Sequence, residues 1–270
     1  MTEEYRYLDI QGERVFAAFH NPTEPCTKAV VMCYPLGEEK LWAHRVFVSL
    51  GRALSSAGVA VLRFDYRGEG DSDRDFEQTD LETRVADACL TIDALCETHP
   101  TVSEVTLLGL RFGTCVAAAT ATRRQVARLI LCDPVVDGAA HMQSVLRLNL
   151  MYQMALHRRV VENRDALAAR LHQGGTVNIE GYELAGPLYL QTSAFSLREA
   201  LCNFRGETIL VPFMQPDLLA SDERMLVASA LERCRVVPVT EKPFWRETKN
   251  FCQRAEALTS VAMSALGAAK

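Results

Sequence analysis

One short segment of the chain combines a catalytic layout with a residue that cannot perform the catalysis. Residues 105–115 read Val-Thr-Leu-Leu-Gly-Leu-Arg-Phe-Gly-Thr-Cys, an apolar strand that passes straight into an alanine-rich helix. The glycine spacing around Arg111 matches the nucleophile elbow, in which a serine sits on a strained strand-to-helix turn. A guanidinium is always protonated and only donates hydrogen bonds, so Arg111 cannot attack a carbonyl. The segment predicts a retained catalytic scaffold with altered chemistry.

The other members of a Ser-His-Asp triad are only partly present. In the elbow layout, the acid and then the histidine follow the nucleophile along the chain. Asp217 stands in Phe-Met-Gln-Pro-Asp, where the acid is expected, but the last of the six histidines is His172. The loop in which a histidine should stand reads Glu-Lys-Pro-Phe-Trp and ends at Trp245. Serine-type acyl transfer is therefore not expected. Asp217 is left as the N-cap of a helix over 218–232, or as an ion-pair or ligand contact in a pocket.

The backbone donors of an oxyanion hole do not depend on these side chains. The amide of Phe112 and one amide from Leu36 or Gly37 are expected to supply them. Together with Arg111 and the positive end of the helix starting at 112, they predict a concentrated positive spot. A buried arginine needs an anionic partner, and two kinds stay open: an anionic ligand or an internal acid. The internal acids considered are Glu38, Glu39, Asp133 and Asp217.

Two further groups offer chemistry in place of a serine. Cys33 ends the strand before the oxyanion loop, and a nearby arginine would lower the pKa of its thiol. The consecutive Glu38 and Glu39 form a candidate acid–base pair. Because no histidine or aspartate cluster joins these glutamates, no metal site is predicted. The nine cysteines show no Cys-x-x-Cys spacing, so neither a zinc site nor a disulfide framework is expected, and no cofactor is predicted.

The hydrophobic pattern predicts the elements that position these residues. Segments 5–10 and 14–20 alternate in polarity and predict an antiparallel hairpin. The following apolar runs are continuous, which is typical of parallel strands buried on both faces. Between them, helices are predicted. The predicted strands are 29–33, 59–64, 105–108, 129–132 and 208–213, and the predicted helices are 42–57, 80–97 (after a capping box of Thr79 and Glu82) and 112–123.

A longer segment, 139–172 and extending up to about residue 200, interrupts this alternation of strands and helices. We predict that it forms a helical cap over the carboxyl ends of the strands, where ligands bind in open parallel sheets. Arg147, an isolated cation in an apolar run of this cap, and Trp245 are then expected at the pocket. The whole chain, 1–270, is predicted to be a single α/β domain of the α/β-hydrolase fold, with a mostly parallel central sheet, helices on both faces and a helical cap insertion.

Bulk composition excludes several classes of protein. A net charge of −5 argues against nucleic-acid binding, which usually needs a basic excess. No apolar run approaches the roughly 18–20 residues that span a bilayer. The first residues, Met-Thr-Glu-Glu-Tyr-Arg-Tyr, do not resemble a signal peptide, so a cytoplasmic location is expected.

Several motifs together resemble a known family. Phe64-Asp-Tyr-Arg-Gly-Glu-Gly-Asp-Ser72 is similar to a loop of serine aminopeptidase-like α/β hydrolases. More narrowly, five segments resemble the second type of exosortase-A-system-associated hydrolase, in which an arginine in the elbow is itself a mark of the group. The five segments are Tyr34–Glu39, Gly109–Gly113, Asp133–Gly138 with Leu146–Leu148, Glu180–Leu184 and Pro243–Trp245. The resemblance implies the α/β-hydrolase fold and brings no established substrate.

Three functions remain open at this point. The first is a hydrolase-like protein with a degenerate triad, a pseudoenzyme or non-standard enzyme, that binds a small anionic or acyl- or peptidyl-bearing ligand at Arg111. The second is an esterase- or amidase-type hydrolase that uses Cys33, or water activated by Asp217. The third is a non-catalytic assembly partner that binds another protein, or a second copy, through the cap. Its contact would be the apolar residues Met142, Val145, Leu148, Met151 and Met154.

Overall fold

A mostly parallel eight-stranded sheet forms the centre of the molecule in the computed structural model, which describes residues 1–246 and 252–268. The first two strands form an antiparallel hairpin, the second also pairs antiparallel with β4, and all other neighbours pair in parallel. In spatial order the strands are β1 (Thr2–Ile10), β2 (Glu13–Asn21), β4 (Ala60–Phe64), β3 (Lys28–Cys33), β5 (Glu104–Leu110), β6 (Arg128–Cys132), β9 (Glu207–Val211) and β10 (Cys234–Val236).

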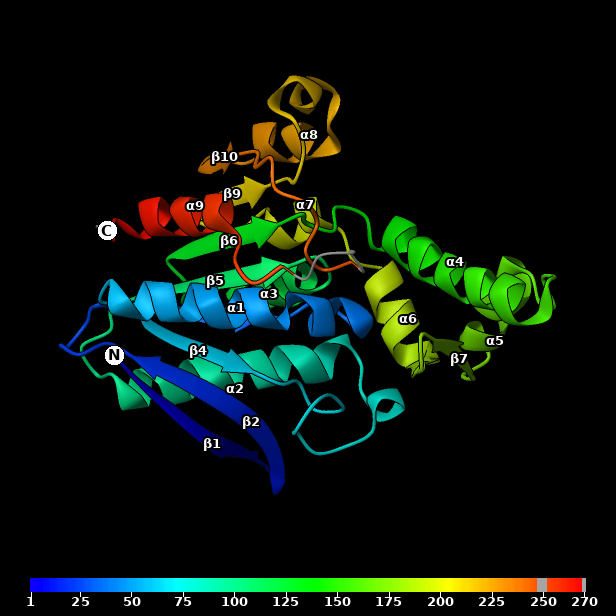
Figure 1. Cartoon of the computed structure of the whole chain (residues 1–270), viewed down its shortest axis with the longest axis horizontal. Coiled ribbons are helices and arrows are strands. Elements are labelled where there is room, and N and C mark those ends of the chain that lie inside the picture. Colours follow the sequence, from blue (N-terminus) through cyan, green and yellow to red (C-terminus); the bar gives the residue numbers. More distant parts are fainter. Residues whose placement is uncertain (247–251, 269–270) are drawn as a thin grey trace.

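Helices cover both faces of this sheet (Figure 1). One face carries α1 (Glu38–Ser56) and α9 (Glu256–Leu266), and the other carries α2 (Leu81–Thr98), α3 (Gly113–Ala121) and the short α7 (Leu197–Leu201). The central strands are buried along nearly their whole length, as the continuous apolar runs predict. These features show the α/β-hydrolase fold expected from the sequence.

Most of the chain between β6 and β9 forms a separate layer at the carboxyl ends of the parallel strands, at the right of Figure 1. It consists of α4 (Gly138–His157), α5 (Arg164–His172), a two-stranded sheet of β7 (Thr176–Ile179) and β8 (Tyr182–Ala185), and α6 (Gly186–Ser193). We call residues 138–193 the cap. Outside the cap lie the 3-10 turns η1 (Phe76–Gln78) and η2 (Pro216–Ser221) and the helix α8 (Glu223–Ser229).

Two helix starts differ from the sequence expectation. Helix α1 begins at Glu38 rather than at residue 42, which places both glutamates in its first turn beside the elbow. Helix α2 is capped by Asp80, whose carboxylate accepts a hydrogen bond from the Thr83 amide at 2.8 Å, and the capping box at Thr79 is wrong. The Thr79 hydroxyl instead donates to the carbonyl of Phe76 and accepts from Arg84. Among the described residues, no helix has both the length and the apolarity to cross a membrane.

Candidate ligand-binding site

The elbow forms with an arginine at its apex. Arg111 follows β5 directly and has a φ of 53°, in the left-handed region that costs a non-glycine residue conformational energy. The two flanking glycines are required by close packing: a Cβ on Gly113 would lie 2.2 Å from the carbonyl oxygen of Cys33, and a Cβ on Gly109 would lie 2.6 Å from that of Gly113. The turn at Arg111 therefore has the positive φ and the close backbone packing of a nucleophile elbow, with an arginine at its apex.

The Arg111 guanidinium lies between two carboxylates. Its Nε donates to Oε1 of Glu39 at 3.3 Å, and its Nη1 donates to Oδ2 of Asp133 at 3.1 Å. The other oxygen of Asp133 accepts from Arg224 at 2.6 Å, and Arg224 also pairs with Asp222 at 2.5 Å. These five residues form one connected group, the Arg111 ion-pair chain. Three carboxylates face two guanidiniums, so the concentrated positive charge expected at the elbow is largely neutralised.

The charged side chains of the Arg111 ion-pair chain remain partly open to solvent. The side chains of Arg111 and Asp133 are 19% and 18% exposed. Burial raises the pKa of Glu39 more than the neighbouring Arg111 lowers it. Burial also opposes the charge of Arg111, but Glu39 and Asp133 outweigh this and raise its pKa. Within the described part of the chain, the third guanidinium nitrogen of Arg111, Nη2, has no hydrogen-bond partner.

A cavity of about 730 Å³ opens above Arg111, between the elbow and the cap. Its wall combines an apolar surface with a few charged groups, the composition that suits a small molecule with an apolar body and a polar end. The apolar wall comes from Leu36, Trp42, Phe76, Val145, Leu148, Met151, Tyr152, Ile179, Tyr182, Leu184 and Trp245. The charged members are Glu38, Glu39, Arg111, Arg147, Glu180 and Arg246. Three cations therefore face three acids across the cavity wall.

Two helix N-termini converge on the same place. Helix α1 begins after Gly37 and helix α3 begins after Phe112, and neither start has a side-chain cap. Within the described residues, the amides of Leu36, Gly37 and Phe112 donate no hydrogen bond, and of these residues Leu36 and Gly37 line the cavity. Such amides favour an anion or a carbonyl oxygen.

One cavity residue was missed by reasoning from the sequence. His141, in the first turn of α4, is buried, lines the cavity and stacks on Phe112 with 6.4 Å between ring centroids. Burial, and secondarily the Arg111 charge, lowers the pKa of His141 to about 3. Among the described residues, no hydrogen bond joins His141 to a hydroxyl or thiol. The order of triad residues along the chain predicted a histidine after β9, so a histidine in the cap was not considered. The one feature of the sequence that could have indicated His141 is its position near the start of the insertion.

The structure does not bring all the expected residues to the cavity. Leu36, Gly37, Glu38, Glu39, Arg147 and Trp245 line it with Arg111, whereas Phe112 is fully buried and is not part of the cavity wall. Cys33 is fully buried outside the cavity wall, and burial raises the pKa of its thiol to about 12, so it is no activated nucleophile. Asp217 is exposed in η2, and the cap of α8 is Asp222. The N-cap role of Asp217 for a helix over 218–232 is therefore wrong, and Asp217 is not among the residues that line the cavity.

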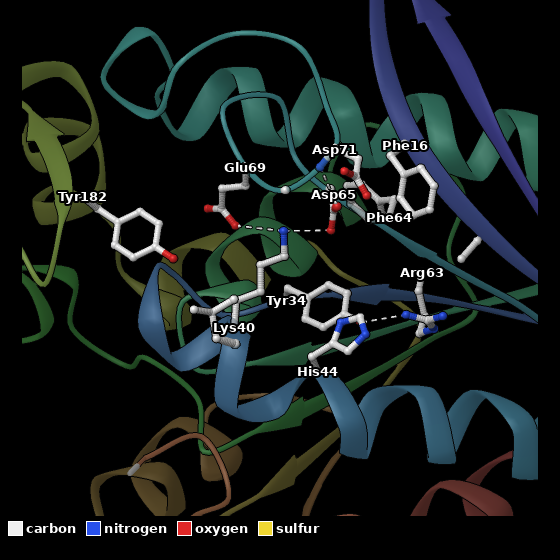
Figure 2. A pocket seen from close by; sticks show the side chains of 13 residues that line it. Phe16, Tyr34, Lys40, His44, Arg63, Phe64, Asp65, Glu69, Asp71 and Tyr182 are labelled. Atoms are coloured by element: carbon white, nitrogen blue, oxygen red, sulfur yellow. Dashed lines mark hydrogen bonds and ion pairs between the residues drawn. The ribbon is translucent and has the colours of Figure 1, made fainter.

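A second, smaller cavity of about 240 Å³ lies beside the first turn of α1 (Figure 2), and Tyr182 lines both cavities. In it, Lys40 Nζ lies 2.7 Å from Asp65 Oδ1 and 3.5 Å from Glu69 Oε2. Arg84 pairs with the other oxygen of Glu69 at 2.5 Å. Among the described residues, no group of three or more His, Cys, Asp and Glu side chains could hold a metal ion.

Comparison with known proteins agrees with this geometry. The family model described as Serine aminopeptidase, S33, matches residues 28–176, which include the elbow and part of the cap. No curated protein matches the sequence. Among solved structures, Est1E from Butyrivibrio proteoclasticus with ferulic acid bound has a TM-score of 0.64 at 17% identity, over 87% of this chain and 88% of that one. The proline iminopeptidase of Mycobacterium smegmatis has a TM-score of 0.61 at 14% identity, over 98% of both chains. At these identities the likeness concerns the fold alone.

Proposed function

The chain belongs to the serine aminopeptidase family, and from this premise we propose that its cavity binds an anionic or acyl-bearing small molecule at Arg111 without forming an acyl-enzyme. One observation carries the proposal: a guanidinium occupies the nucleophile position, faces a large cavity and keeps Nη2 without a protein partner. The elbow holds no serine, and Ser144 of the cavity wall donates to the Ala140 carbonyl at 3.1 Å rather than to an imidazole. With no hydroxyl–imidazole pair and no activated thiol among the described residues of the site, the covalent route of the family has no nucleophile.

The ligand chemistry follows from the cavity wall. Arg111 Nη2 and the amide of Leu36 are both donors at the cavity wall, so the polar end of the ligand must accept hydrogen bonds. A carboxylate or the carbonyl of an acyl group meets this requirement. The apolar residues around these donors suit an aliphatic or aromatic body. Est1E, which shares the fold, was solved with ferulic acid, a molecule of this kind, and ferulate is therefore a suitable probe.

A thermal-shift series tests the proposal. The probes are ferulate, decanoate, inorganic phosphate and an acyl-sugar, each with the parent protein, Arg111→Ala and Arg123→Ala. Arg123 is an exposed arginine that pairs with Glu82 outside the cavity wall, so its variant is the matched control. A ligand at about 100 times its Kd stabilises the folded state by about 2.7 kcal/mol. We expect at least one carboxylate to raise the Tm of the parent and of Arg123→Ala, but not of Arg111→Ala. A parent that responds to none of the probes contradicts the proposal.

The substitute-nucleophile alternative has its own test in cysteine labelling. Cys202 is exposed, whereas Cys33 is fully buried with a pKa of about 12. We expect iodoacetamide to modify Cys202 first and to leave Cys33 unmodified in the folded protein, because only an accessible thiolate reacts. Peptide mass spectrometry after brief labelling measures this order. Fast modification at Cys33 would restore it as a candidate nucleophile.

The narrower resemblance to the second type of exosortase-A-system-associated hydrolase stays a prediction. Its main support is Arg111 itself, which has a φ of 53° in the elbow.

A further inference from the structure

The outer end of α4 exposes an unusual number of large apolar side chains. Leu156 is 74% exposed, Met151 is 67% exposed, and four more such residues lie in or just after the last turns of the helix. We call residues 151–161 the cap tip. Its exposed large apolar members are Met151, Tyr152, Met154, Leu156, Val160 and Val161. Scattered single apolar residues are ordinary on a protein surface, but a contiguous group marks an interaction site.

The charges around the cap tip have one sign. From Gly138 to Val161 the chain holds three arginines and no acid, although the whole protein has a net charge of −5. Arg147, Arg158 and Arg159 are exposed, and none of them forms an ion pair with a described residue. The nearest acid along the chain, Glu162, is already paired with Arg170. A surface complementary to this tip would therefore be apolar in part and negatively charged.

We propose that the cap tip docks onto a membrane surface that contains anionic lipids. A helix with exposed apolar residues and flanking arginines inserts its apolar side chains at the headgroup boundary, while the arginines extend to the phosphates. The position of the tip suits such a contact, because α4 ends at the extremity of the molecule opposite the two chain termini (Figure 1). This inference goes beyond the proposed function and does not depend on a ligand at Arg111.

Charge argues against a second copy of this chain as the occupant. A symmetric contact between two cap tips would bring Arg158 and Arg159 against the same residues of the other copy. Because the tip contains no acid, these like charges would face each other without compensation. An anionic lipid surface supplies the missing negative charge.

Docking of the tip has a consequence for the large cavity. Arg147 lies one turn before the tip and Met151 belongs to it, and both side chains line the cavity as well as being exposed. The mouth of the cavity would then lie at the lipid surface. A molecule with an apolar body could pass between lipid and cavity with little exposure to water.

Vesicle flotation of the whole protein tests the docking. The vesicles are phosphatidylcholine alone, or phosphatidylcholine mixed with phosphatidylglycerol. The variants are Leu156→Glu, the double variant Arg158→Ala/Arg159→Ala, and the control Leu226→Glu. Leu226 lies on α8, outside the cap, and is 74% exposed, as Leu156 is. All of these side chains are exposed, so we expect unchanged Tm values.

The expected result is binding of the parent to the mixed vesicles, with much weaker binding to neutral vesicles. Leu156→Glu should weaken the apparent affinity at least about 10-fold, since an inserted leucine is replaced by a charge. Loss of two arginines should weaken it about 30-fold, and Leu226→Glu should bind as the parent does. Absence of parent binding to the mixed vesicles, or an equal loss in Leu226→Glu, overturns the proposal. A parent dimer that Leu156→Glu separates into monomers, without vesicle binding, would assign the tip to self-association instead.

Discussion

The two cavities beside the first turn of α1 hold the same arrangement in different surroundings. In the smaller cavity, Lys40 lies between Asp65 and Glu69. The side chains of Lys40 and Glu69 are 8% and 2% exposed, and that of Asp65 is 16% exposed. In the larger cavity, Arg111 lies between Glu39 and Asp133, and each of these three side chains is roughly a fifth exposed. Both cations keep their charge, because neighbouring acids outweigh burial and raise the pKa of each.

The difference separates a structural cation from one that is available to a ligand. Lys40 is enclosed by its acids and by the Tyr34 ring, 5.8 Å away, in the cavity shown in Figure 2. Arg111 has committed two of its three guanidinium nitrogens and faces three times as much cavity volume. An internal ion pair and a ligand site are therefore not exclusive at Arg111. The acids orient the guanidinium, and its remaining edge stays open.

The largest effect is expected on the free energy of unfolding when Lys40 is replaced. Lys40→Met leaves Asp65 without its 2.7 Å partner and leaves Glu69 with Arg84 alone. Removing one partner of a buried pair costs about 3–5 kcal/mol, because the remaining charge stays buried and uncompensated. Urea unfolding measures the free energy of unfolding of the variant against the parent. A loss below about 1 kcal/mol would mean that Lys40 is not structural.

The same substitution at Arg111 should cost less. Arg111→Met leaves Glu39 partly open to solvent, and Asp133 keeps its bond to Arg224. We expect a loss of about 1–2 kcal/mol in the free energy of unfolding, from the same urea titration. If Arg111→Met is as destabilising as Lys40→Met, the two cations have the same structural role and the comparison fails.

At neutral pH the smallest effect is expected for His141, whose substitution should change the sensitivity of the protein to acid instead. Burial lowers the pKa of His141 from 6.5 to about 3, so the folded protein holds it neutral while the unfolded chain protonates. The stability from this group is complete above pH 6.5 and is lost as the pH falls toward 3, by at most about 1.4 kcal/mol per pH unit. Unfolding of His141→Gln across this range should show a flatter pH dependence than the parent.

His44→Gln is the matched variant from the smaller cavity. Partial desolvation also lowers the pKa of His44, but this residue is much more exposed than His141. Its substitution should therefore change the slope of the unfolding free energy against pH less. Equal slopes for His141→Gln and the parent would show that His141 is not held neutral by the fold.

The sequence was sufficient for the sheet and the elbow because both depend on local patterns. Continuous apolar runs such as 29–33 require burial on both faces, and the spacing of Gly109 and Gly113 reflects backbone contacts closer than any side chain allows. The predicted start of α1 is four residues late, because the first turn of the helix lies outside the amphipathic pattern from which the helix was predicted. The consequence was important, since the early start brings Glu39 to Arg111.

The partners in the site could not be read from the sequence, because they lie far apart along the chain. Asp133 was one of four acids considered for Arg111, and nothing local favoured it over Asp217. Only the parallel pairing of β5 with β6 brings Asp133 beside the elbow. Arg224 and His141 come from α8 and the cap, whose positions depend on tertiary packing. The cap tip was foreseen only in part: Met151 and Met154 are exposed, but Met142 is fully buried.

Calorimetric titration with ferulate and with its methyl ester tests the central claim most directly, because the two molecules share a body and differ in charge. If the open edge of Arg111 holds a carboxylate, the parent should bind ferulate at least about 10-fold more tightly than the ester, the range of a charge-assisted hydrogen bond. In Arg111→Gln the two affinities should become equal. Equal affinities in the parent, or an undiminished preference for ferulate in Arg111→Gln, would contradict the account.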